Sequence, residues 1–60
     1  MKLKPGDLVA HIAALSQNSY AQKLSLGIVL EVCEENNWVD VYWFKLKRNV
    51  MHSIERVRKV

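Results

Sequence analysis

Apolar and polar residues alternate most regularly between positions 38 and 44. One face of this segment carries Val39, Val41 and Trp43. The opposite face carries four residues that we expect to point outward: Trp38, Asp40, Tyr42 and Phe44. A period of two predicts a half-buried β-strand, because successive side chains of a strand point to opposite faces. We therefore expect the valine face, with Trp43, to lie in the core.

The preceding apolar segment, Gly27 to Val32, is also rich in β-branched residues, which favour strands. It is apolar on both faces, so alternation alone does not show which side points inward. A bulge, or coverage by another strand, would explain this pattern. Between the two segments lie four polar residues, Glu34-Glu35-Asn36-Asn37. Asn tolerates left-handed backbone angles, and the whole stretch predicts a tight β-hairpin.

The N-terminal part predicts one more strand, followed by a long loop. Lys4-Pro5-Gly6-Asp7 has the composition of a turn, and residues 8–12 after it read as a strand. Residues 10–15 also contain good helix formers, so a short helix is the alternative. Residues 13–25 show neither period for long. Within this loop, Tyr20 is a candidate contact residue, or it folds back with Leu24 to cover one end of the domain.

The C-terminal part predicts two short strands. A polar connection at residues 45–49 leads to a strand at 50–52, and residues 53–55 resemble a single 3₁₀ turn with Ile54 in the core. Residues 56–60 alternate, and we expect Val57 and Val60 to point inward. Five short strands in 60 residues predict one all-β domain spanning residues 1–60, folded as a small antiparallel barrel.

Composition narrows the class of protein. Half of the residues are hydrophobic and a quarter are charged, as in globular domains. No apolar run approaches the roughly 20 residues that cross a bilayer, and the first residues lack a signal-peptide pattern. We therefore expect a cytoplasmic protein. The single cysteine, Cys33, cannot form an internal disulfide, and we interpret it as a small, half-buried hydrophobic residue.

The net charge of +3 is unevenly distributed. Residues 31–40 contain four acidic residues and no base, whereas residues 45–60 contain a single acid, Glu55. The basic residues of this C-terminal part are Lys45, Lys47, Arg48, Arg56, Arg58 and Lys59. Such a polarised surface attracts an anionic partner. The alternative is that these are ordinary solvated charges that keep a small protein soluble.

Three segments in order resemble a known superfamily. They are Pro5-Gly6-Asp7-Leu8-Val9, then Gly27-Ile28-Val29-Leu30-Glu31-Val32, then Val39-Asp40-Val41-Tyr42-Trp43. This succession resembles the SH3-like barrels and the KOW-type modules within them, and residues 53–57 are similar to the turn and last strand of such barrels. The resemblance implies a five-stranded antiparallel barrel with a long loop after the first strand and a 3₁₀ turn before the last. The chain also resembles small uncharacterised proteins of tailed bacteriophages.

The sequence gives little support for catalysis or metal binding. His11, Cys33 and His52 lie on separate predicted elements without the short pairing typical of zinc sites. We expect no enzyme activity, no metal, no cofactor and no small-molecule substrate.

The predicted function is a phage-encoded protein-interaction or structural module, located in a host cytoplasm or a virion. Its partner would be a host protein, a virion protein or a second copy of the chain. The predicted contact residues are Trp38, Tyr42, Phe44 and Tyr20. The alternative is a KOW-like nucleic-acid-binding protein, in which the six basic residues contact phosphates and the outward aromatic residues stack on bases.

Overall fold

The computed structural model describes residues 2–15 and 22–60. In these residues the chain forms five strands and two 3₁₀ turns: β1 (Leu8–His11), η1 (Ile12–Leu15), β2 (Gly27–Cys33), β3 (Trp38–Trp43), β4 (Arg48–Ser53), η2 (Ile54–Arg56) and β5 (Val57–Lys59). The strands form one sheet in the order β4-β3-β2-β1-β5, and every neighbouring pair is antiparallel. The predicted all-β fold and the turn before the last strand are confirmed.

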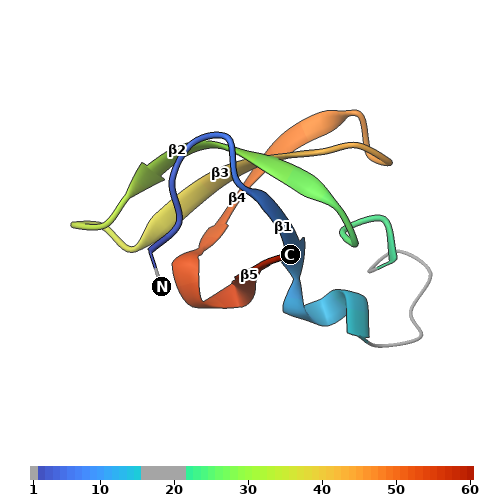
Figure 1. The fold of residues 1–60 in the computed structure, drawn as a ribbon, viewed down its shortest axis with the longest axis horizontal. Helices are drawn as coiled ribbons and strands as arrows, with labels where there is room; N and C mark the ends of the chain where they lie inside the picture. Colours follow the sequence, from blue (N-terminus) through green and yellow to red (C-terminus); the bar gives the residue numbers. More distant parts are fainter. Residues whose placement is uncertain (1, 16–21) are drawn as a thin grey trace.

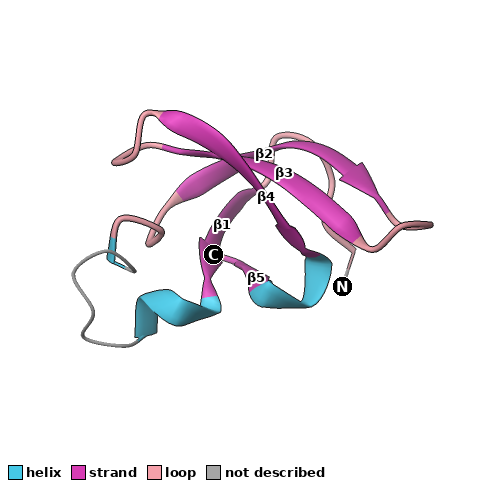
Figure 2. Ribbon diagram, turned by 180° about the vertical axis from the view of Figure 1, so that it is seen from behind, coloured by secondary structure: helices cyan, strands magenta, loops and turns pink. Residues whose placement is uncertain are grey.

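The sheet curls on itself. Strands β2, β3 and β4 form a long twisted layer, and β1 crosses beneath it with β5 alongside (Figure 1; Figure 2). The two edge strands, β4 and β5, are not paired with each other. The sheet is therefore an open barrel with two free edges.

The core lies inside this curl. Its buried residues are Val9, Leu24, Val29, Val39, Val41, Trp43 and Val57. The predicted inner face of β3 is confirmed, since Val39, Val41 and Trp43 are fully buried. Leu24 is 6% exposed, so this residue does fold back onto the core as predicted, whereas Tyr20 lies outside the described residues.

The central hairpin forms where the sequence predicts it. Residues 34–37 make the turn, and Asn37 adopts the left-handed conformation with φ 58°. A bulge interrupts the β2–β3 register between Val29 and Glu31. This bulge explains why β2 is apolar on both faces, because it shifts the pairing within the strand.

Several features of the structure differ from the prediction. The first strand ends at His11, and Ile12–Leu15 form a 3₁₀ turn, so strand and helical preferences each hold for part of the segment. β4 is longer than predicted, because residues 48–53 pair continuously with β3.

The third difference concerns Val60. The prediction that this residue points inward is wrong, since Val60 is 74% exposed while Val57 is buried. Residues three apart lie on opposite faces of a strand, so the two valines do not share the core face.

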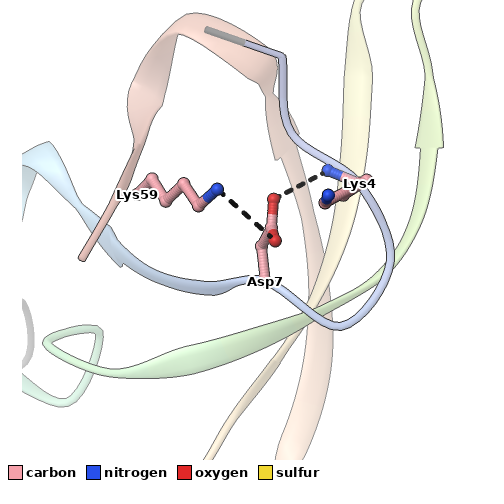
Figure 3. Close-up of polar contacts among 3 residues, drawn as sticks. All are labelled: Lys4, Asp7 and Lys59. Atoms are coloured by element: carbon pink, nitrogen blue, oxygen red, sulfur yellow. Dashed lines mark hydrogen bonds and ion pairs between the residues drawn. The ribbon is translucent and has the colours of Figure 1, made fainter.

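A turn before β1 ties the two ends of the described chain together. The backbone N–H of Lys4 donates to the carboxylate of Asp7 at 3.0 Å, and the N–H of Asp7 donates to the carbonyl of Lys4 at 3.1 Å. Gly6 has φ 95°, which favours glycine. Figure 3 shows the Nζ of Lys59, on β5, reaching the same carboxylate at 3.8 Å. Asp7 therefore closes the turn and holds the last strand beside it.

Candidate interaction surface

The outer face of the sheet collects apolar side chains from three strands. Paired residues of antiparallel strands share a face. The register pairs Leu8 with Ile28 and Ile28 with Tyr42, so these three form one row across β1, β2 and β3. Asn49 of β4 continues the row. The register thus assembles an apolar strip from residues far apart in the sequence.

Further apolar residues extend this strip. Phe44 follows β3, is 42% exposed, and packs edge-to-face against Tyr42 with ring centroids 5.9 Å apart. Leu30 at the bulge and Met51 on β4 are also exposed, Met51 by 57%. We call the set the outer apolar face: Leu8, Ile28, Leu30, Tyr42, Phe44 and Met51. An exposed apolar cluster of this kind is a candidate interaction surface.

An acidic row lies next to this strip. The register pairs Glu31 with Asp40 and Asp40 with Met51. The side-chain amide of Asn49 donates to both carboxylate oxygens of Asp40, at 3.0 and 3.2 Å. The outer face therefore carries negative charge beside its apolar residues, which disfavours contact with a polyanion there.

The predicted aromatic contact residues are only partly brought together. Tyr42 and Phe44 are in contact. Trp38 lies on the same face but pairs with Cys33 and Ser53, and Asp40 lies between it and Tyr42 along β3. Tyr20 falls outside the described residues.

Sequence reasoning missed Leu8, Ile28, Leu30 and Met51 as parts of this surface. Alternation in residues 27–33 does not distinguish the faces, and the register across strands is the information that does.

The six basic residues fall into two separate groups. Lys45 and Lys47 lie in the β3–β4 turn, and Arg48 begins β4. Arg56 ends η2, and Arg58 and Lys59 lie on β5. Both ribbon views show the turn at the far end of the β3–β4 hairpin and β5 beneath the sheet (Figure 1; Figure 2). The six residues therefore do not form the single continuous basic end that the sequence suggests.

A second cluster joins three aromatic rings on the inner side of the curl. The indole Nε1–H of Trp43 donates to Nε2 of His52 at 3.0 Å. The rings of His52 and His11 meet edge-to-face with centroids 4.7 Å apart, and His11 lies 6.5 Å from Trp43. The backbone N–H of Ala13 donates to Nδ1 of His11 at 2.9 Å. We call His11, Trp43 and His52 the imidazole–indole cluster.

The surroundings of this cluster favour the neutral form of both histidines. Burial lowers the pKa of His11 below its ordinary value of 6.5, and the charge of Arg56 lowers this pKa further. Burial also lowers the pKa of His52, with a second contribution from His11. Each ring uses one nitrogen as an acceptor, and an acceptor nitrogen carries no proton.

Two open hollows lie at the end of the barrel next to Leu3 and Ile54. Their volumes are about 240 and 490 Å³, and they are lined by a mixture of apolar, acidic and basic side chains. Neither hollow is lined by a histidine or by Cys33. Among the described residues, no group of three or more His, Cys, Asp or Glu side chains is arranged to hold a metal ion.

The comparisons with known proteins add no relative. No family model, no curated protein and no solved structure matches this chain. In the part of the chain that the structure describes, no helix is long and apolar enough to cross a membrane.

Proposed function

We propose that this protein is a non-enzymatic interaction module that binds another protein through the outer apolar face. The observation that carries the proposal is the apolar strip that the strand register builds from β1, β2 and β3, extended by Phe44. A chain of 60 residues has a small core, and covering exposed apolar surface by a partner adds stability by mass action.

Charge supports a protein partner over nucleic acid at this surface. Glu31 and Asp40 lie on the same face as the apolar strip and repel phosphates. The basic side chains nearest in sequence, Lys45 and Lys47, lie in the turn after Phe44, at the margin of the face. An apolar centre with charged residues at its edge is the usual anatomy of a protein–protein interface. The resemblance to phage proteins makes a virion protein, a host protein or a second copy the first partners to test.

The test compares two single substitutions. Phe44→Ser removes an exposed aromatic side chain of the outer apolar face, and Glu35→Ser changes an exposed residue in the β2–β3 turn. Aromatic residues at the centre of an interface often contribute about 2 kcal/mol or more, so F44S should weaken binding by roughly thirtyfold or more. Immobilised wild-type and variant proteins would be exposed to host and phage lysates, and light scattering on a sizing column would report self-association.

The result expected is a specific partner, or a dimer, that is retained at high salt by the wild type and by E35S but not by F44S. Equal retention by all three proteins would show that the outer apolar face is not the binding surface.

Nucleic-acid binding is the second candidate. It is favoured by the position of exposed Phe44 in the same turn as Lys45 and Lys47, because an aromatic ring beside cations suits stacking on a base next to a phosphate. Binding of this type falls steeply as salt rises. A complex with a mixed-sequence oligonucleotide that disappears at high salt, and is weakened by Lys47→Gln, would therefore replace the protein-binding proposal.

A further inference from the structure

The imidazole–indole cluster joins two strands that are not neighbours in the sheet. His11 ends β1 and His52 lies on β4, whereas the strand order places β2 and β3 between them. The two rings nevertheless meet with centroids 4.7 Å apart, because the sheet curls and brings the inner side of β1 to the inner side of β4. This side-chain contact therefore bridges the barrel where no backbone ladder joins the two strands.

Both hydrogen bonds that the described residues make with these rings require the neutral form. His52 accepts from the Trp43 indole through Nε2, which leaves its own proton on Nδ1. His11 accepts from the N–H of Ala13 through Nδ1, which leaves its proton on Nε2. A protonated imidazole has two donors and no acceptor, so proton uptake at either ring breaks its bond. Two imidazolium rings this close would also repel each other.

Among the described residues, no acidic side chain contributes to the pKa shifts of the pair. The charge that acts on His11 is the guanidinium of Arg56, at the end of η2, and the charge that acts on His52 is that of His11. From β3 the pair meets the Trp43 indole, and by register the neighbours are Val57 of β5 and Val39 of β3. A positive neighbour and a half-buried setting against apolar side chains both disfavour imidazolium.

We propose that the imidazole–indole cluster is an acid-sensitive latch, which holds β1 against β4 at neutral pH and releases them when its histidines take up protons. The release loosens the inner side of the barrel around Trp43 and frees the β1–β4 crossing. His11 and His52 are the only histidines of the chain. Histidine is the side chain that ordinarily titrates near pH 6.5, so this response should be separate from the titration of the other side chains.

The sign of the effect follows from proton linkage. Each histidine has a folded-state pKa below its ordinary value of 6.5, so the unfolded chain binds protons more readily than the folded one. The stabilisation is complete above about pH 6.5, and it is lost as the pH falls through 6.5 toward the lower pKa of the folded state. This range lies above pH 4, near which carboxyl groups ordinarily titrate.

The direct test follows the Trp43 indole N–H by NMR between pH 7.5 and 5. A Trp38→Phe background leaves a single indole, because the chain has two tryptophans. We expect this N–H to be protected from exchange at pH 7.5 and to lose that protection, with a change in chemical shift, in step with titration of the two imidazoles. An indole N–H that stays protected to pH 5, or imidazoles that titrate without affecting it, would overturn the latch.

A histidine-free variant and one matched pair of arginine variants complete the test. His52→Gln retains an amide oxygen that accepts from the indole but does not titrate, so the double variant H11Q/H52Q should lose the drop in melting temperature between pH 7 and 5.5. Arg56→Gln should raise the pKa of His11 and shift the release to higher pH, whereas Arg58→Gln, on exposed β5, should not. The same acid response in the histidine-free variant would also overturn the proposal.

Discussion

At the scale of single residues, Gly27 stands where β2 and β3 leave no room for a side chain. A Cβ atom at this position would lie 2.7 Å from Cε3 of Trp43, from the carbonyl oxygen of Tyr42 and from Cγ1 of Val41. One of these neighbours is backbone and another is a fully buried indole, so neither moves easily. Gly27 therefore lets β2 approach β3 beneath the largest side chain of the core.

The first prediction is that Gly27→Ala destabilises the fold. Overpacking of this kind typically costs about 1–3 kcal/mol. In a domain of this size each kcal/mol lowers the melting temperature by roughly 4–8 °C. Thermal unfolding followed by circular dichroism would measure the loss. Glu35→Ala, an exposed turn substitution in the same hairpin, should stay within about 0.5 kcal/mol of the wild type, and an equal loss in both variants would contradict this explanation.

Residue roles were predictable where one strand alone decides them. Val39, Val41 and Trp43 alternate with polar or amphipathic residues, and their burial follows from that pattern. Val60 was predicted wrongly, because the prediction placed Val57 and Val60 on one face although residues three apart in a strand point to opposite faces. Ile28 lay beyond prediction, because its face depends on the bulge and on the register with Tyr42.

At the scale of elements, the β3–β4 turn carries a local strain. Lys47 adopts φ 58°, the left-handed region, while its backbone N–H donates to the carbonyl of Trp43 at 2.8 Å. A non-glycine residue in this conformation costs roughly 1–2 kcal/mol. This hydrogen bond and the hairpin hold Lys47 in the left-handed conformation. The sequence predicts only a polar connection at residues 45–49 and does not indicate the positive φ.

The second prediction is that Lys47→Gly stabilises the protein. Glycine adopts φ > 0 without steric cost, although it loses more entropy on folding, so we expect a net gain of about 0.5–1 kcal/mol. Denaturant unfolding would detect this gain as a higher midpoint with an unchanged slope. Lys45→Gly is the matched control, because Lys45 does not have a positive φ and should gain nothing. A loss of stability in K47G would show that the lysine side chain stabilises the fold by more than the backbone strain destabilises it.

Elements were predicted well where turns flank them. The central hairpin follows from the polar run at residues 34–37 and the strand composition on either side. The boundary at His11 was harder, because Ile12–Leu15 contain residues that suit a helical turn as well as a strand. The tertiary bond from the N–H of His11 to the carbonyl of Leu24 contributes to that end of β1, and no local pattern contains it.

At the scale of the whole molecule, stability rests on few side chains. Among the described residues, seven form the buried cluster, and Trp43 is the largest of them. A domain of this length has a free energy of unfolding of roughly 3–9 kcal/mol. The loss of one large side chain is therefore comparable with the stability of the whole fold.

The third prediction is that Trp43→Ala leaves the chain largely unfolded at 37 °C. Truncation of a buried Trp costs about 3–5 kcal/mol. Trp38→Ala, on the outer face and only half-buried, should remain folded with a smaller loss. Amide dispersion in a proton–nitrogen NMR spectrum would distinguish the two outcomes, and a folded W43A variant would show that the core tolerates a large cavity.

The pairing of β5 with β1 also affects how the protein is made. Val9 of the first strand pairs with Lys59 of the last, and the N–H of Val60 donates to the carbonyl of Leu8 at 2.9 Å. On the ribosome, β1 therefore has no partner on that side until residues 57–59 have been synthesised. Contacts so distant in sequence slow folding, because a long loop must close before they form. A nascent chain stalled before Val57 should thus be open to proteases.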